Sequence, residues 1–341
     1  MFELSAASQT GVNINSMYDW GLAVIRAFQG AGNPAIECVA RFFTLVGATA
    51  FYAIIFLIFW CIDEKKGFRL GLFVMLSNGI NAALKVNLRV PRPYESDPSV
   101  GIIHATGYST PSGHAQNSSV FWPLLMAGSS SSEKSPDKKR LPRGSRIAIA
   151  IMIPLCVGLS RIYLGVHYPT DVMLGWIIGA VLASLAIFIL PAAGNAFLSY
   201  PPTARIVESF NSYAEASGRS LKMFKIALAA LVAFALNAVS LGDTSMGGML
   251  FGFVTGYILL TDKNDKADAP RFSAASGSLP KKALRLVPGF AGVALSLYSI
   301  KLISPFFGVA DKALLLFIGC AIAGFWASYL APKLFMKLKL A

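Results

Sequence analysis

"FFTLVGATAFYAIIFLIFWCI", residues 42–62, contains no charged side chain. The hydrocarbon core of a bilayer is about 30 Å thick and a helix rises about 1.5 Å per residue, so about 20 apolar residues can cross it. The stretch therefore predicts a transmembrane α-helix, and the rest of the chain decides whether that helix stands alone.

The composition shows that it does not stand alone. Of 341 residues, 55% are hydrophobic and 14% are charged, and the mean hydropathy is +0.59. Soluble domains carry about 25% charged residues, so an ordinary soluble globule is excluded. We predict an all-α polytopic membrane protein of about nine transmembrane helices, with further spans at about 67–88, 112–130, 146–162, 170–191, 223–241, 245–262, 285–303 and 313–332.

The basic residues are distributed unevenly between the two sides of these spans. On the side of the 63–69 loop lie 22 of the 30 lysines and arginines, many of them in the polar loops 129–146 and 262–282. The positive-inside rule makes that side cytoplasmic, with the N-terminus outside and the C-terminus in the cytoplasm. The net charge of +13 then reflects topology, and no nucleic-acid partner is expected.

The N-terminal segment lacks the features of a secretory signal. Residues 1–16 hold neither a basic n-region nor an apolar h-region, so we expect no cleavable signal peptide. Residues 14–29 predict an amphipathic helix, with Tyr18 and Trp20 suited to the membrane interface.

The first candidate site stretch is "KVNLRVPRP", residues 85–93. Lys85 and Arg92 are seven residues apart and would share a helical face, although Pro91 opposes a continuous helix. A lysine point charge and an arginine fork suit a phosphate group. The alternative is that both side chains anchor the helix end at the lipid headgroups.

The second stretch is "STPSGH", residues 109–114, which predicts the start of a helix. Ser109 or Thr110 can cap the helix and Pro111 fits its first turn. The N–H groups of Ser112, Gly113 and His114 would then face an anion at the positive end of the dipole. The alternative is a capped helix that carries an interfacial histidine.

The third stretch is "SRIYLGVHYPTD", residues 160–171. Asp171 follows His167 by four residues and can hold one ring nitrogen as N–H, which leaves the other nitrogen as a base or nucleophile. Arg161 would end the preceding span. The alternative is a salt-bridged turn between two helices.

The expected topology places all three stretches on the outer side of the membrane. The spans that carry them end there, so three cations, two histidines and one carboxylate can converge. Ionisable groups at membrane depth are costly and indicate function.

In order and spacing, the three stretches resemble the three-part signature of the type 2 phosphatidic acid phosphatase (PAP2) superfamily. The matching positions are Lys85-x6-Arg92-Pro93, Pro111-Ser112-Gly113-His114 and Ser160-Arg161-x5-His167-x3-Asp171. The resemblance covers residues 42–240 and implies a six-helix core. We therefore expect an outer segment at 1–41, a catalytic core at 42–241 and three additional spans at 242–341.

The resemblance also implies the role of each residue. His167 would be the nucleophile, Asp171 would orient it, and His114 would be the general acid. Lys85, Arg92, Ser112, Gly113 and Arg161 would bind the phosphate. No cofactor and no metal are expected, because the carboxylates of the outer motifs are dispersed. Arg89 and His104 have no assigned role.

The resemblance leaves the substrate open. The third motif, with Asp171 present, is similar to bacterial lipid phosphatases, which implies a lipid phosphate or diphosphate hydrolysed at the periplasmic face of a bacterial cytoplasmic membrane. The expected nine spans instead resemble glucose-6-phosphatase and a sugar phosphate. A non-catalytic lipid-binding or transport protein is a remote third alternative. The oligomeric state is not predicted.

Overall fold

The computed structural model describes residues 14–47, 50–127, 141–199, 221–240, 243–261, 271–306 and 308–341, with the isolated positions 205, 208, 209 and 212. Residues 1–13, 128–140 and 262–270 lie outside the described residues. They hold most of the segment 1–16, in which no signal peptide is expected, most of the expected polar loop 129–146 and the first nine residues of the expected polar loop 262–282. The described residues form helices and connecting turns without any strand, which confirms the all-α prediction.

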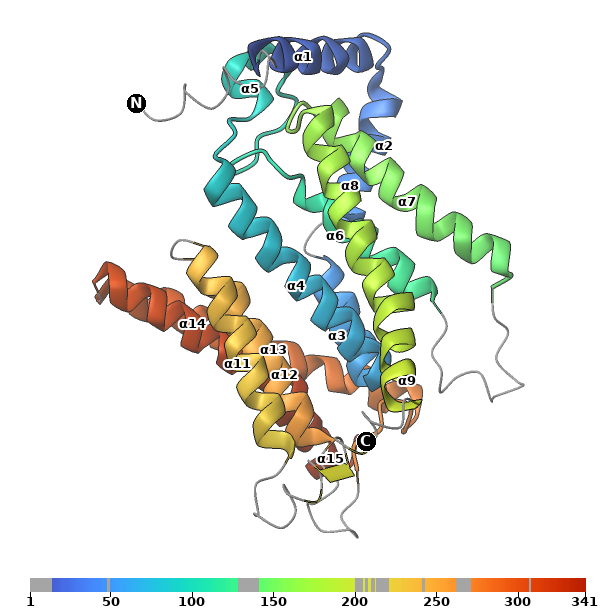
Figure 1. Cartoon of the computed structure of the whole chain (residues 1–341), viewed down its shortest axis with the longest axis vertical. Coiled ribbons are helices and arrows are strands. Elements are labelled where there is room, and N and C mark those ends of the chain that lie inside the picture. The colour runs from blue at the N-terminus through green and yellow to red at the C-terminus, as the bar shows by residue number, and fades with distance from the viewer. Residues whose placement is uncertain are drawn as a thin grey trace. The chain divides into compact units, whose positions relative to one another are not determined.

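Helices lie at the other expected spans, but the expected single helix at 42–62 is wrong, because two helices, α2 and α3, share that stretch (Figure 1). Their bounds are α1 (Ile14–Gly30), α2 (Pro34–Val46), α3 (Ala50–Cys61), α4 (Glu64–Leu88), α5 (Pro93–Ser96), η2 (Pro98–Val100), α6 (Gly113–Met126), α7 (Arg143–Tyr163), α8 (Pro169–Ser184), η4 (Leu185–Ile189), α9 (Leu190–Ser199), α11 (Leu221–Val239), α12 (Ser245–Leu260), α13 (Leu279–Ile303), η5 (Ser304–Phe306), α14 (Val309–Phe325), η6 (Trp326–Leu330) and α15 (Ala331–Lys337).

The number of helices that can cross a bilayer is smaller than nine in the part of the chain that the structure describes. Five are long and apolar enough, and a sixth results if α2 and α3 count together as one span. The expected spans at 67–88, 112–130 and 245–262 do form helices. However, α4 carries charges at both ends, and α6 and α12 have only 14 and 16 residues. The chain is thus a multi-pass integral membrane protein, and a count of nine is not confirmed.

The chain divides into two compact units, and the division falls within α4 and α8. The first unit comprises the described residues within 1–50, 84–126 and 139–181. In it, α7 contacts both α2 and α6, and α1 lies across the end at which α7 finishes (Figure 1). All the residues of the three motifs belong to this unit.

Two glycines let α8 approach α6 very closely. A β-carbon on Gly175 would lie 2.7 Å from the carbonyl oxygen of Ser112, and one on Gly179 would lie 2.4 Å from that of Gln116. Small residues four apart allow helices to meet backbone to backbone in membranes, where lipid tails give little hydrophobic drive for association. This contact fixes the start of α6 against the first turns of α8.

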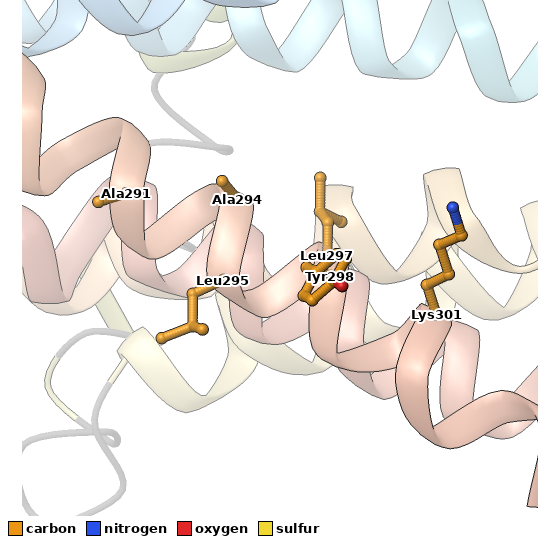
Figure 2. Close-up of a pocket in the computed structure, with 6 residues that line it drawn as sticks. All are labelled: Ala291, Ala294, Leu295, Leu297, Tyr298 and Lys301. Carbon is orange, nitrogen blue, oxygen red and sulfur yellow. The ribbon is translucent and has the colours of Figure 1, made fainter.

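The second unit comprises the described residues within 51–83, 127–138 and 182–341. In this unit, α12 packs against α11 and α14 (Figure 1). Along α13 runs an open groove of about 610 Å³, with Lys301 at one end of a largely apolar lining (Figure 2). The lining residues are Ala291, Ala294, Leu295, Leu297, Tyr298 and Lys301, and none of them belongs to a motif.

A buried arginine ties several segments of the second unit together. Arg285, at the start of α13, is fully buried. Its guanidinium donates to the carbonyl oxygens of Trp60, Ala274, Ser276 and Leu340 at 2.7–3.1 Å. Because a buried charge is stable only when its donors are satisfied, these carbonyls allow the arginine to be buried.

Candidate active site

The motif residues meet at one end of the first unit. Lys85 comes from the last turn of α4 and Arg161 from the last turn of α7. The turn between α7 and α8 carries His167, and the first turn of α8 carries Asp171. The segment 106–112, ahead of α6, runs between them, because its carbonyl and hydroxyl groups contact residues of both other motifs. The expected convergence of the three motifs is therefore present.

Lys85 and Arg92 are brought together by this segment and not by a shared helical face. Helix α4 ends at Leu88, and Arg89 has a φ of 49°, so the chain leaves the helix before Arg92. The Lys85 ammonium donates to the carbonyl oxygens of Tyr108 and Ser109. The carbonyl oxygens thus orient the charge without an opposing carboxylate.

Arg92 is held in the same way and reaches the histidine. Its Nε donates to Gly107 O at 2.7 Å and its Nη2 to Thr106 O at 2.8 Å. Its Nη1 donates to Val166 O at 2.9 Å and lies 3.4 Å from His167 Nε2. Arg92 is buried, so its rigid fork is fixed beside the ring nitrogen that faces away from Asp171.

The other ring nitrogen of His167 faces a carboxylate with many donors. His167 Nδ1 lies 3.5 Å from Asp171 Oδ2. The hydroxyl of Ser109 donates to Asp171 Oδ2 at 2.5 Å, and Thr110 Oγ1 donates to Asp171 Oδ1. The backbone N–H of Tyr168 donates to Oδ2 at 2.8 Å. Both carboxylate oxygens are thus hydrogen-bonded, and the pair is buried.

Helix α6 starts later than its sequence suggests. It begins at Gly113, so neither Ser109 nor Thr110 caps it and Pro111 is not in its first turn. The Ser112 N–H donates to the carbonyl oxygen of Asp171 at 3.0 Å and is not available to an anion. The Ser109 and Thr110 hydroxyls do not cap α6, because both donate to the Asp171 carboxylate.

Two buried polar atoms near the start of α6 and the end of α7 have no partner among the described residues. They are Ser112 Oγ and Arg161 Nε. The Gly113 and His114 N–H groups, in the first turn of α6, precede the first intrahelical donor, which is the Gln116 N–H. A buried donor without a partner is costly, so these groups form a site that an oxyanion would complete.

Arg161 and the turn after it are fixed by small residues. Arg161 Nη1 donates to Thr44 Oγ1 at 3.2 Å. Gly165 has a φ of +70°, and a β-carbon there would lie 1.7 Å from Val100 O. Only glycine fits this left-handed position without strain, and it brings the turn that carries His167 against residues 98–102.

His114 belongs to the cluster, whereas His104 and Arg89 do not. His114 lies within electrostatic range of Arg161, His167, Arg92 and Lys85. His104 is exposed and contacts Tyr94 with ring centroids 4.7 Å apart and ring planes tilted by 58°. Arg89 is exposed and donates to Val86 O at 3.1 Å.

Helix α1 braces the turn that carries His167. Gln29 Nε2 donates to Val100 O and to Tyr163 O, both at 2.8 Å. Tyr18 packs against Tyr168 with ring centroids 5.1 Å apart and ring planes tilted by 33°. Trp20 is exposed. The turn that carries His167 is therefore supported by α1, a helix that contains no motif residue.

Burial affects the pKa values of His167 and Arg92. It lowers the pKa of His167 far below its ordinary value, and the nearby Asp171 only partly opposes this. Burial also lowers the pKa of Arg92, but an arginine stays charged at any physiological pH. The unliganded site thus contains a neutral His167 beside a permanent cation.

The arrangement suits an electrostatic cradle built from side chains. In the described ranges, no group of three or more His, Cys, Asp or Glu residues is placed to hold a metal ion. The donors that converge are the cations Lys85, Arg92 and Arg161, the Ser112 hydroxyl and the first N–H groups of α6. Such donors stabilise charge that develops on a phosphoryl group.

Comparisons with known proteins match two stretches of the chain to one superfamily. The sequence profile of the PAP2 superfamily matches residues 66–195, and that of the PAP2 superfamily phosphatase transmembrane extension matches residues 244–341. The chain is 32% identical over 121 residues to phosphatidylglycerophosphatase B of Bacillus subtilis (strain 168), an overlap of 33% of this chain and 54% of that protein. It thus spans about half the length of this curated relative.

Two solved structures are similar at lower identity. The PAP2-type phosphatidylglycerolphosphate phosphatase of Bacillus subtilis is 24% identical, with a TM-score of 0.42 over 53% of this chain and 88% of that chain. LpxE of Aquifex aeolicus is 23% identical, with a TM-score of 0.40 over 48% of this chain and 93% of that chain.

The fold and the site together define a multi-pass α-helical membrane protein with a buried cluster of cations and histidines. The chain belongs to the PAP2 superfamily and carries the family's transmembrane extension.

Proposed function

We propose that the protein is a membrane phosphatase that hydrolyses a lipid-linked phosphate or diphosphate through a phosphohistidine intermediate. The observation that carries the proposal is the orientation of the His167 ring. Its Nδ1 faces Asp171 and its Nε2 faces the fixed fork of Arg92. The lone pair of Nε2 therefore points to the place where a phosphoryl group would be bound.

In the first half of the reaction, the Nε2 lone pair of His167 attacks phosphorus and the bond from phosphorus to the leaving oxygen breaks. Protonated His114 gives its proton to that oxygen. The phosphorylated ring carries a positive charge, which the Asp171 carboxylate stabilises. Lys85, Arg92, Arg161, Ser112 and the Gly113 N–H hold the three equatorial oxygens.

In the second half, water attacks the phosphohistidine. Neutral His114 removes a proton from the water, and the bond between phosphorus and His167 Nε2 breaks. Inorganic phosphate leaves, and both histidines return to their starting states. Side-chain cations supply the charge that this scheme requires, so we propose that no metal ion takes part.

A lipid is the substrate class that the observations favour. The site lies in a helical unit whose α7 and α8 are apolar enough to cross a bilayer, which gives a lipid headgroup a short path from the membrane. The relative with the 32% match is named a phosphatidylglycerophosphatase. The sugar-phosphate alternative rested on nine spans, a count that the described helices do not confirm.

We also propose the membrane topology and the bounds of the catalytic core and the C-terminal region that the sequence predicts. The excess of basic residues in the loops on one side supports a site that faces the outside of a bacterial cytoplasmic membrane, with the C-terminus in the cytoplasm. The catalytic core would extend over residues 42–241, and the additional C-terminal region over residues 242–341.

A substrate panel tests the proposal. Purified protein in detergent micelles would receive undecaprenyl diphosphate, phosphatidate, phosphatidylglycerol phosphate and glucose 6-phosphate, and released phosphate would be measured. We expect release from at least one lipid and none above the blank from glucose 6-phosphate. Release from glucose 6-phosphate alone would select the sugar-phosphate alternative, and no release from any substrate would contradict a phosphatase.

A further inference from the structure

Ser109 and Thr110 precede the Pro-Ser-Gly-His stretch, and their side chains contact the third motif. Ser109 is fully buried, and its Oγ lies 2.5 Å from Asp171 Oδ2 and 3.3 Å from His167 Nδ1. Thr110 Oγ1 donates to the other oxygen of the same carboxylate. The two hydroxyls therefore hold Asp171 from both of its oxygens.

Ser109 also links this pair to the cations. Its carbonyl oxygen accepts from the Lys85 ammonium at 2.8 Å, and its N–H donates to Val90 O at 2.8 Å. One residue thus joins the end of α4, the segment before Arg92 and the first turn of α8. A small displacement of Ser109 would move both the carboxylate and a phosphate-binding cation.

The hydrogen-bond directions fix which nitrogen of His167 carries the proton. A hydroxyl has one proton to donate, and Ser109 gives it to the Asp171 carboxylate. Towards His167, the Ser109 oxygen can then only accept. The carboxylate can likewise only accept, so both neighbours of Nδ1 require it to be an N–H.

We propose that Ser109 and Thr110 are positioning residues that hold the Asp171 carboxylate and, through it, the Nδ1-protonated tautomer of His167. The catalytic meaning of this tautomer rests on the proposed function, because it leaves Nε2 as the nucleophile. The tautomer itself is a property of the unliganded protein and can be measured without any substrate.

The first experiment measures the tautomer. The chain has only three histidines, His104, His114 and His167. Uniform ¹⁵N-histidine labelling therefore gives few ring signals, and a His167→Asn variant identifies those of His167. At neutral pH we expect Nδ1 of His167 to be protonated in the wild type. The ring should become a mixture of tautomers in the double variant Ser109→Ala/Thr110→Val.

The second experiment separates the effect of the Thr110 hydroxyl group from the effect of the volume of its side chain. Thr110→Val keeps the volume and removes the hydroxyl, whereas Thr110→Ser keeps the hydroxyl and removes a methyl group. A hydrogen bond to a charged group changes equilibria about 10- to 100-fold. We expect Thr110→Val to lower kcat about tenfold with KM within about twofold, and Thr110→Ser to retain kcat within about twofold of the wild type.

Ser109→Ala should lower kcat in the same way, and the double variant should lower it further. A kcat effect at constant KM indicates that binding of the phosphate is intact and attack is impaired. Thermal melting of each variant shows whether the fold is retained, and the ¹⁵N spectrum remains informative if a variant is inactive.

Three outcomes would overturn the proposal. They are an unchanged tautomer in the double variant, equal loss of kcat in Thr110→Ser and Thr110→Val, or wild-type kcat in both single hydroxyl deletions. Absence of phosphate release by the wild-type protein would contradict the proposed function instead, and an Nδ1-protonated His167 that depends on both hydroxyls would still support the positioning role.

Discussion

Nη1 of Arg92 lies 3.4 Å from Nε2 of His167. A cation that is fixed by backbone carbonyl oxygens therefore stands beside the nitrogen with the free lone pair. An oxygen of a phosphoryl group that approaches this nitrogen meets the guanidinium at the same time.

The arginine fork predicts a large effect of a conservative change. Arg92→Lys keeps the charge but cannot donate to Thr106, Gly107 and Val166 together. We expect kcat/KM to fall by at least about 100-fold, since hydrogen bonds of charged groups contribute about 1.5–3 kcal/mol each. Steady-state phosphate release measures this. Arg89→Lys, at an exposed arginine three residues away, is the matched control and should change kcat/KM less than about twofold.

The two buried histidines should fail at different steps. His167→Ala removes the nucleophile and should abolish hydrolysis. His114→Ala removes the general acid, so a substrate with a good leaving group should still phosphorylate His167 and then hydrolyse slowly. Acid-labile ³²P on the protein after a rapid quench measures this intermediate. His104→Ala is the control, and full activity of either of the other two alanine variants would disprove the scheme.

The lowered pKa of His167 predicts that acid destabilises the fold. The unfolded chain binds a proton on this ring below about pH 6.5, while the folded chain keeps it neutral until a much lower pH. Because the unfolded state binds more protons in that window, stability falls as pH drops. We expect the wild type to lose more melting temperature between about pH 7.5 and about pH 5 than His167→Gln does. Equal losses would show that the ring is protonated in the fold.

The brace from α1 predicts an effect outside the three motifs. Gln29→Met has a similar shape but loses the hydrogen bonds to Val100 O and Tyr163 O. Each carbonyl that loses its partner costs about 1 kcal/mol or more, so melting temperature and kcat should both decrease. Asp19→Asn, at an exposed position of the same helix, is the control. An unchanged kcat in Gln29→Met would limit α1 to a role in stability.

Chelation should leave turnover intact. The charges that face the substrate come from Lys85, Arg92 and Arg161, which EDTA does not remove. We expect phosphate release to persist at millimolar EDTA after prior dialysis against the chelator. Complete loss, restored by added Mg²⁺, would require a metal ion in the mechanism.

Much of this architecture could be predicted because membrane helices and catalytic motifs leave local patterns. Uncharged runs marked the helices, and the spacing of Arg161, His167 and Asp171 marked the turn between α7 and α8. The span count was less predictable, since α4 is charged at both ends and α6 is short and polar. Length and hydropathy do not show whether such helices cross the bilayer or remain inside the protein.

The contacts of Ser109, Thr110 and Gln29 could not be predicted in the same way. Two hydroxyls before a helix usually cap it, and only the approach of α8 shows that Asp171 binds them instead. Gln29 contacts residues 71 and 134 positions away, and a lone glutamine in an amphipathic helix gives no sign of such partners. For Ser109 and Thr110, the one local signal is that two small residues with hydroxyl groups follow each other in the sequence.

The carbonyl oxygens around Lys85 and Arg92 have a consequence for the end of the catalytic cycle. Dipoles orient these cations without cancelling their charge, and neither cation forms an ion pair in the described part of the chain. Cations whose charge is not cancelled have a standing affinity for any small tetrahedral anion, including the inorganic phosphate that the proposed reaction releases. Product inhibition is therefore the expected cost of a site that is ready to bind before the substrate arrives.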